Sequence, residues 1–411
     1  MKMVIIGAGA SGLTAAISAA KNGNEVTVLE LKDIPGKKIY ATGNGKCNIT
    51  NDRMDVSCYN SDDKLFVERL ISKYQTRDII EFFEDLGIAL KNEEGYYYPR
   101  SKQASTIVEV LVNECERLGV SFIYNCNVKD IRKEDETFVV RANIQKDKNQ
   151  EKIEIYADKV AIACGGKSSP KLGSDGTGYY LAGKLGHTIN EVVPSLVPLC
   201  CDDSVNGKYL KMLHGVRCDA YVMEYDIDNK IDEYCSVKYG QSGEIQMTDY
   251  GVSGIVVFQM SGRINRKLLR GEKAYINIDF FPEEEVETLC EKIDRLLVKF
   301  DLFTSLRYLI NSKLAEVICD IVANKYHNVY SGLDVAKEIK NFKLEVVGSK
   351  GFDFSQVSSG GVSVCELHDT MESKLVKGLF LIGEVLDVDG ICGGYNLHFA
   401  FASGIEAGKN A

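Results

Sequence analysis

Three glycines near the start of the chain have the spacing of a phosphate-binding turn. The apolar run 3–6 leads directly into Gly7, Gly9 and Gly12, and a helix-like stretch continues to about Asn22. In such a strand–turn–helix unit the first glycine permits a tight turn and the second lets the backbone approach a pyrophosphate. The third lets the helix pack closely on the strand. Free N–H groups at the helix start would then face the phosphates, so the spacing predicts a dinucleotide site.

A carboxylate at the end of the next strand narrows the choice of dinucleotide. Residues 25–29 read as a strand, and Glu30 is placed to accept hydrogen bonds from the ribose hydroxyls of an adenosine. The same carboxylate repels a 2′-phosphate, which disfavours NADP and leaves FAD and NAD. The late strand 378–382 ends in Gly383 and Glu384, as expected where an FAD-dependent two-domain oxidoreductase returns to its cofactor. This second segment favours FAD over NAD.

Composition limits the class of protein. A chain of 411 residues with 45% hydrophobic and 26% charged residues is long enough for two or three globular domains. The net charge of −10 argues against a nucleic-acid or anionic-membrane surface. There is no apolar run long enough to cross a bilayer, and the first strand begins at Met3, leaving no room for a signal peptide. We therefore expect a cytoplasmic protein that binds neither nucleic acid nor membrane.

The cysteines and histidines do not form a recognisable site. The 13 cysteines include no pair with CxxC spacing, which argues against a flavin disulfide reductase. The five histidines do not cluster with cysteines at zinc-like spacing. Reduced thiols and no metal site are the expectation.

Changes in sequence texture predict a discontinuous dinucleotide domain, 1–191 and 342–411, with an insertion. Its first part, 192–281, contains alternating segments typical of an antiparallel sheet or small barrel. The second part, 282–341, has apolar residues at helical spacing and predicts a pair of helices. The predicted fold class is α/β, a Rossmann-like FAD/NAD(P)-binding domain of the glutathione-reductase type with an inserted barrel-like domain and a helical subdomain. The alternating segments are 215–224, 234–239, 243–248 and 274–280.

Two further glycine-rich stretches allow more than one interpretation. The segment 42–48 is either an ordinary surface loop or a lid over the cofactor. The segment 173–178 does not follow a clear parallel strand, so it does not predict a second dinucleotide unit. NADH or NADPH would then have to reduce the flavin during a transient visit, and the physiological donor is not predicted.

Four stretches together resemble the BaiN-like FAD-dependent oxidoreductases, a family of bacterial flavoproteins. The resemblance covers nearly the whole chain, and its most specific parts are the second and fourth stretches. The four are Gly7 to Gly12, Gly36 to Lys38 with Thr42 to Asn51, Ala163 to Pro170, and Met371 to Leu397.

The resemblance implies a set of cofactor contacts. Ala10, Ser11 and Gly12 would meet the pyrophosphate, and Glu30 the adenosine ribose. Val128 would contact the adenine through its backbone, and Lys38 would reach phosphate or ribityl oxygens. The further cofactor-binding positions would be Gly45, Cys47, Asn48, Gly165, Gly383, Glu384, Asp389, Asn396 and Leu397. Among these, Cys47 and Asn48 would approach the isoalloxazine, and Glu384 and Asp389 the ribityl chain and pyrophosphate. Asn396 and Leu397 would present N–H groups to the pyrimidine edge.

The chain departs from the family pattern at a few positions. Lys46 stands where the family usually has an arginine, and Leu397 is followed by His398 and Phe399 rather than by a glutamine and a tryptophan. These changes are compatible with FAD binding and bear on the substrate.

The predicted function is an FAD-dependent reductase or dehydrogenase acting on a hydrophobic or unsaturated small molecule. The family resemblance implies, as one possible reaction, the reduction of conjugated double bonds in bile-acid-like steroids. The alternatives are a flavin-dependent oxidase of amine type and a flavin-binding sensor or interaction protein without turnover. The titratable candidates for a proton donor are Tyr395, His398 and Cys47. Each also has a purely structural interpretation: Tyr395 as a packing residue, His398 as a cap or hydrogen-bonding group of the last helix, and Cys47 as a small buried residue. No catalytic residue and no oligomeric state are predicted.

Overall fold

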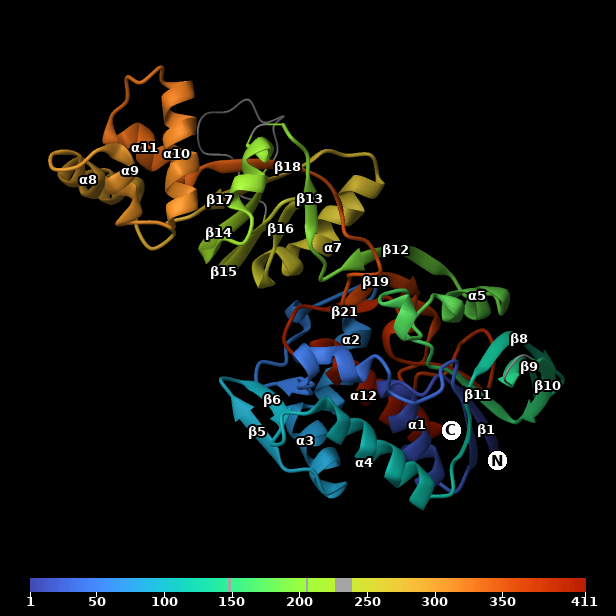
Figure 1. Ribbon diagram of the computed structural model, residues 1–411. Coiled ribbons are helices and arrows are strands. Elements are labelled where there is room, and N and C mark those ends of the chain that lie inside the picture. Colours follow the sequence, from blue (N-terminus) through green and yellow to red (C-terminus); the bar gives the residue numbers. More distant parts are fainter. Residues whose placement is uncertain (147–148, 205, 226–238) are drawn as a thin grey trace. The chain divides into compact units, whose positions relative to one another are not determined.

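The computed structural model describes residues 1–146, 149–204, 206–225 and 239–411 (Figure 1). The chain divides into two compact units. The first unit contains Met1–Val193 and Gln356–Ala411, and the second contains Pro194–Ser355. No helix within the described ranges has the length and apolar character needed to cross a membrane.

A five-stranded parallel sheet forms the centre of the first unit, in the order β20-β11-β1-β2-β7. Four of the five residues of β1 are buried, as expected when both faces of a parallel sheet are covered. The glycine turn follows β1, the central strand, so it lies at the carboxyl end of the sheet, where open α/β folds bind ligands. The strands are β1 (Lys2–Ile6), β2 (Glu25–Leu29), β7 (Ser121–Ile123), β11 (Lys159–Ile162) and β20 (Leu379–Leu381).

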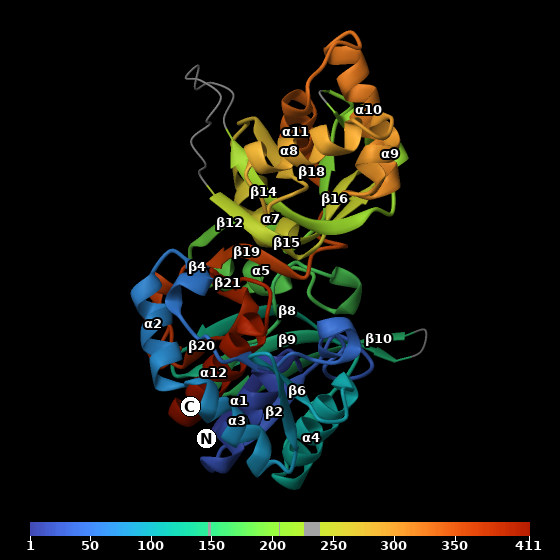
Figure 2. The ribbon, with the colours of Figure 1, turned by 90° about the vertical axis from the view of Figure 1, so that its left-hand side faces the viewer.

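Helices from both ends of the chain pack beside this sheet. The first and last of them, α1 and α12, lie side by side (Figure 2). Apolar residues at helical spacing within 64–87 form two helices, α2 and α3. The helices are α1 (Ala10–Lys21), α2 (Lys64–Lys73), α3 (Thr76–Asp85), α4 (Ala104–Arg117), α5 (Thr177–Lys184) and α12 (Tyr395–Asn410).

Four small sheets complete the first unit, in the orders β10-β9-β8, β12-β19, β21-β4 and β3-β6-β5. The chain leaves this unit along β12 and returns along β19. Their strands are β3 (Thr50–Asn51), β4 (Tyr59–Ser61), β5 (Leu90–Glu93), β6 (Tyr96–Pro99), β8 (Cys126–Glu134), β9 (Thr137–Lys146), β10 (Asn149–Ala157), β12 (Ile189–Ser195), β19 (Val357–Val362) and β21 (Val388–Gly390).

The second unit is a closed barrel with strand order β13-β16-β15-β14-β17-β18, so the predicted small barrel is present. The predicted segments 215–224, 243–248 and 274–280 fall on its strands, whereas 234–238 lie outside the described residues. The strands are β13 (Leu199–Cys201), β14 (Arg217–Tyr225), β15 (Tyr239–Thr248), β16 (Gly251–Ser253), β17 (Ala274–Asp279) and β18 (Phe342–Ser349).

The end of the insertion differs from the sequence expectation. The chain was expected to rejoin the dinucleotide domain at residue 342, but β18 pairs with β17 and β13 to close the barrel. The second unit accordingly extends to Ser355. An alternating apolar strand fits either sheet, and only its pairing partners decide between them.

The helices α8, α9, α10 and α11 gather beside the barrel (Figure 1). The expected pair of helices is divided further, because the side chains of Asp301 and Asn311 cap new helices after short breaks. The helices are α6 (Leu210–Leu213), α7 (Ile255–Leu269), α8 (Val286–Leu297), α9 (Leu302–Arg307), α10 (Ser312–Lys325) and α11 (Gly332–Lys340).

Candidate cofactor site

The three glycines of the first turn have three different surroundings. Gly7 has φ +108°, and a Cβ there would lie 2.4 Å from the carbonyl oxygen of Ala163. A Cβ on Gly12 would lie 1.9 Å from the carbonyl oxygen of Gly7. A Cβ on Gly9 would have no neighbour within 4 Å. The first and third glycines are therefore required by packing, whereas Gly9 borders open space that a ligand can enter.

Two helix N-termini border the same cleft. The helix α1 begins after Gly9 and α12 begins after Gly394, so the first N–H groups of both helices have no intrahelical acceptor. Ala10 and Ser11 from α1, and Asn396 and Leu397 from α12, line the cleft. Free N–H groups and the positive ends of two helix dipoles thus favour negative charge in this space.

Small residues hold the two helices close together. A Cβ on Gly404 of α12 would lie 2.2 Å from Thr14 Oγ1 and 2.3 Å from the carbonyl oxygen of Ser11 in α1. One turn later, a Cβ on Gly408 would lie 2.5 Å from the carbonyl oxygen of Ala15. Larger side chains at these positions would push the two helices apart.

Glu30 is held at one end of the cleft by backbone groups. Its Oε2 accepts a 2.7 Å hydrogen bond from the Ala8 N–H, and its Oε1 accepts a 2.8 Å bond from the Lys32 N–H. Burial raises the pKa of this carboxyl, while the two backbone N–H groups oppose that shift. Each carboxylate oxygen keeps a further lone pair, which can accept a ribose hydroxyl.

Lys38 and Glu384 bind each other in the cleft. Lys38 Nζ lies 2.5 Å from Glu384 Oε2 and 2.6 Å from Ser168 Oγ. Glu384 Oε1 accepts hydrogen bonds from Ser168 Oγ at 2.6 Å and from the Ser358 N–H at 2.9 Å. A Cβ on Gly166 would lie 2.9 Å from Glu384 Oε1, so this glycine gives the carboxylate its room. The network joins four separate chain segments around the start of α1.

The cleft contains about 1220 Å³ of empty space, its open mouth included. It brings together eleven of the sequence-predicted residues, which come from seven separate stretches of the chain. They are Gly7, Gly9, Ala10, Ser11, Glu30, Lys38, Val128, Gly165, Glu384, Asn396 and Leu397. The cleft also contains residues that were not predicted to bind the cofactor, among them Asn127, Ser174, Gln356 and Phe399. Two of these had a sequence signal: Ser174 lies in the glycine-rich stretch 173–178, and Phe399 departs from the family pattern.

Six other predicted residues do not line the cleft. Gly12 and Gly383 pack behind it, and a Cβ on Gly383 would lie 2.4 Å from Ser11 Oγ. Asp389 is buried, with Oδ1 accepting a 2.5 Å bond from Ser359 Oγ and Oδ2 accepting a 3.3 Å bond from Asn60. The remaining three are Gly45, Cys47 and Asn48, which lie on or just after the short helix Ile39–Gly45.

The cleft fits an FAD molecule by three observations. Gly9 leaves open space between the two helix N-termini, where a pyrophosphate is stabilised. Glu30 stands at one end with its carboxylate oriented. Ser174, which lines the cleft, has a buried Oγ for which the described residues provide no hydrogen-bond partner. Native proteins rarely leave such atoms unpaired, so a polar ligand is the expected partner.

The three candidate proton donors are buried and paired with protein groups. His398 Nε2 donates to the Tyr74 carbonyl oxygen at 2.8 Å, so Nδ1 accepts from Thr50 Oγ1 at 2.8 Å, and burial lowers its pKa to about 4. Burial raises the pKa of the Cys47 thiol to about 12. Burial also raises the pKa of Tyr395. At neutral pH each of the three stays uncharged, and none is placed as an open acid in the cleft.

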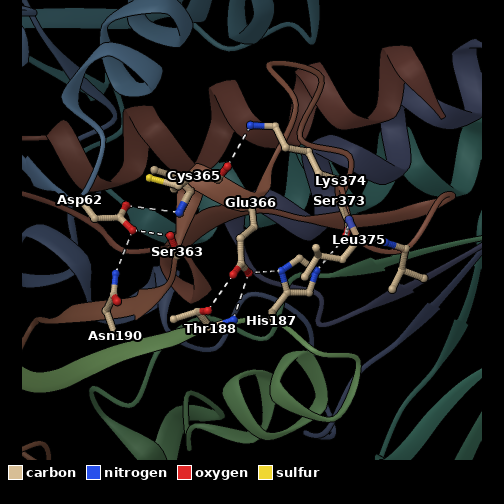
Figure 3. Close-up of polar contacts among 12 residues, drawn as sticks. Asp62, His187, Thr188, Asn190, Ser363, Cys365, Glu366, Ser373, Lys374 and Leu375 are labelled. Carbon is tan, nitrogen blue, oxygen red and sulfur yellow. Dashed lines mark hydrogen bonds and ion pairs between the residues drawn. The ribbon is translucent and has the colours of Figure 1, made fainter.

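In a second polar cluster a serine, a histidine and a glutamate are hydrogen-bonded one to the next, as in a catalytic triad (Figure 3). His187 Nε2 lies 2.8 Å from Ser373 Oγ, and His187 Nδ1 lies 2.9 Å from Glu366 Oε2. Ser373 Oγ also accepts hydrogen bonds from the N–H groups of Leu375 and Val376, at 3.0 and 2.9 Å. Its own proton therefore points to His187, and burial lowers the His187 pKa. Ser373 is only 3% exposed and does not line the cleft, so the cluster is structural.

Potential metal ligands do not converge in this structure. In residues 1–146, 149–204, 206–225 and 239–411, no three His, Cys, Asp or Glu side chains are arranged to hold a metal ion. The cysteines in these ranges are free thiols.

Comparison with known structures defines the class of the fold. A 3-ketosteroid-Δ4-(5α)-dehydrogenase from Rhodococcus jostii superposes with a TM-score of 0.51 at 15% identity, covering 99% of this chain and 95% of that protein. At this identity the likeness concerns the fold alone. Together with the cleft, it defines a Rossmann-like FAD-binding fold that carries an inserted barrel.

Comparison with sequences defines the family. Residues 1–410 match the HI0933-like protein Rossmann domain. A 3-dehydro-bile acid Δ(4,6)-reductase from Clostridium scindens is 39% identical, covering 99% of this chain and 98% of that protein. A ribosomal RNA dihydrouridine synthase from Haemophilus influenzae is 30% identical, covering 97% of this chain and 96% of that protein. The chain belongs to the HI0933-like family and is an FAD-dependent oxidoreductase, which confirms the resemblance drawn from its motifs.

Proposed function

We propose that this protein reduces a carbon–carbon double bond conjugated to a carbonyl group in a hydrophobic small molecule. The observation that carries the proposal is the 39% identity, over nearly the whole of both chains, with a protein named as a bile acid Δ(4,6)-reductase. A bound FAD, once a nicotinamide has reduced it, would supply the hydride for such a reaction. NADH or NADPH is the proposed donor, binding transiently because the chain has one dinucleotide turn of the strand–GxGxxG–helix kind.

The protein's own contribution is to bind the cofactor and stabilise charge. We propose that the N-terminus of α1 and Lys38 hold the pyrophosphate, and that Glu30 holds the adenosine ribose. The N–H groups of Asn396 and Leu397 would stabilise negative charge on the ring system. Gly45, Cys47, Asn48, Val128, Gly165, Gly383, Glu384 and Asp389 are proposed as the further cofactor-binding positions, directly or through the loops that they shape.

The proton that completes the reduction is proposed to come from solvent. Cys47, Tyr395 and His398 are buried, and each has its pKa displaced away from ready proton transfer at neutral pH. A carbanion stabilised by a conjugated carbonyl can take its proton from water once the substrate leaves the cofactor. The proposed location is the cytoplasm, as the sequence suggested.

An anaerobic titration tests the proposal. The purified yellow protein is mixed with NADH and then NADPH while the flavin absorption band is followed, and a 3-oxo-Δ4 steroid is added to the reduced protein. We expect one nicotinamide to bleach the flavin and the steroid to restore its colour. Bleached flavin that only oxygen reoxidises, with hydrogen peroxide formed, would replace the proposal with an oxidase. Flavin that neither nicotinamide bleaches, although light reduces it, would point to a different donor or to a non-catalytic role.

A second candidate is the reduction of uracil in ribosomal RNA. A relative of 30% identity is named a ribosomal RNA dihydrouridine synthase, and its product also has a saturated bond next to a carbonyl. The net charge of −10 opposes binding to RNA, and for that reason we place this candidate second. Mass spectrometry of ribosomal RNA, from cells with and without the gene, separates the two. Loss of dihydrouridine in the deletion strain would promote the second candidate.

A further inference from the structure

The segment Leu172–Thr177 forms a wall of the cofactor cleft that neither the first glycine turn nor the family's motifs account for. It connects β11 to α5, and five of its six residues line the cleft: Leu172, Gly173, Ser174, Asp175 and Thr177. Gly173 has φ +110°, a conformation that side-chain-bearing residues rarely adopt, so the wall depends on a glycine here.

This wall lies at the end of the cleft where Glu30 is held. A Cβ on Gly173 would lie 3.9 Å from Glu30 Oε1 and 3.5 Å from the Lys32 side chain. Glu30 in turn is bonded to the Ala8 N–H of the first glycine turn at 2.7 Å. The segment therefore borders the space between the carboxylate and the phosphate-binding turn, where the adenosine half of a dinucleotide belongs.

Ser174 has an unpaired hydroxyl at this place. The residue is 4% exposed, and the described part of the chain offers its Oγ no hydrogen-bond partner. The Oγ lies 2.8 Å from the position that a Cβ on Gly165 would take, and Gly165 itself lines the cleft. A buried hydroxyl without a partner lowers stability, so the ligand-bound protein is expected to supply one.

We propose that the Ser174 hydroxyl, carried on the wall Leu172–Thr177, hydrogen-bonds the adenosine half of the bound dinucleotide. The inference concerns cofactor binding alone, and it holds whichever substrate is reduced. It gives a role to the glycine-rich stretch 173–178, which is not a second dinucleotide turn but part of the first site.

Cofactor titrations of the full-length apoprotein test this role. We expect Ser174→Ala to raise the Kd for FAD and for ADP about tenfold, the loss typical of one buried hydrogen bond, and to leave the Kd for FMN unchanged. The matched control is Ser305→Ala in the second unit, which removes another buried and unpartnered hydroxyl. It should leave all three dissociation constants unchanged.

Thermal melting gives a readout that a merely structural role would not produce. Because Ser174→Ala removes an unpaired polar group, the variant apoprotein should melt no lower than the wild type. The rise in Tm on adding FAD should become smaller. Equal FAD affinity in wild type and Ser174→Ala would overturn the proposal, and so would an equal loss for FMN, which would move the contact to the flavin half. If Ser174→Ala fails to fold, Ser174→Cys keeps the volume with a weaker hydrogen-bonding group, and the same outcomes apply.

Discussion

Two regions of the first unit gather carboxylate, hydroxyl and backbone N–H groups from distant parts of the chain. In the cluster of His187, Glu366 and Ser373 (Figure 3), the hydrogen bonds run from one protein group to the next, and Ser373 is only 3% exposed. In the cofactor cleft, Gly9 leaves open space and Ser174 Oγ has no partner among the described residues.

The difference shows how a binding site is recognised. The serine–histidine–glutamate order alone suggests a nucleophile, yet Ser373 Oγ already accepts two backbone N–H groups and has no room for a substrate. The cleft has no such familiar order of residues, but it has volume, two helix N-termini and unsatisfied polar atoms. Unpaired polar groups next to open space indicate a ligand site more directly than a familiar order of side chains.

The largest effect is expected at the packed glycine of the first turn. In Gly12→Ala the new Cβ would lie 1.9 Å from the Gly7 carbonyl oxygen, so either β1 or α1 must move. We expect the free energy of unfolding to fall by about 3 kcal/mol and FAD binding to be lost, measured by urea denaturation and by flavin retention.

The matched control is the glycine that borders open space. Gly9→Ala places a Cβ with no protein atom within 4 Å, at φ −86°. The apoprotein should unfold as the wild type does, whereas FAD affinity should fall roughly a hundredfold, because the methyl group occupies the space of the pyrophosphate. Wild-type FAD affinity in Gly9→Ala would place the pyrophosphate elsewhere.

Acid should destabilise the protein through its buried histidines. His398 has its pKa lowered to about 4 from 6.5, so between these pH values the unfolded state binds a proton that the folded state does not. Stability is therefore complete above pH 6.5 and falls as the pH drops toward 4, by about 3 kcal/mol from this residue. The lowered pKa of His187 acts in the same direction. Urea denaturation at several pH values gives the free energy of unfolding as a function of pH. Between pH 4 and 6.5 this free energy should change less steeply with pH in His398→Gln than in the wild type, and identical pH dependence would contradict the assignment.

A smaller loss of stability is expected in the cluster of His187, Glu366 and Ser373. Ser373→Ala leaves the N–H groups of Leu375 and Val376 and the ring of His187 without their partner. Stability should fall by about 2 kcal/mol, while the Kd for FAD and the rate of flavin reduction stay at wild-type values. A folded Ser373→Ala protein that no longer turns over would make the cluster catalytic and break the comparison.

The smallest effect is expected at Cys47. Its thiol is fully buried, and burial raises its pKa to about 12, so it is protonated at neutral pH. Iodoacetamide at pH 8 should label the exposed Cys365 of the native protein and spare Cys47. Mass spectrometry of the peptides reads this directly, and rapid labelling of Cys47 would restore it as a candidate acid.

Much of the candidate cleft could be predicted from the sequence, because a glycine turn of the phosphate-binding kind is local. The strand, the three glycines, the helix and Glu30 lie within about one βαβ unit, and each residue type is required by the backbone around it. Apolar periodicity likewise determined α2, α3 and several barrel strands, since it reports which faces are buried.

Pairing between distant segments was decided only by the tertiary structure. Lys38 and Glu384 are 346 positions apart and neutralise each other in the cleft, although each alone was assigned to the cofactor. The strand β18 alternates like any half-buried strand, and only β13 and β17 assign it to the barrel. His398 and Cys47 are titratable by type, but burial among other segments removes their proton chemistry at neutral pH. Local sequence determines what a segment can form, whereas desolvation and partnership depend on which other segments come to surround it.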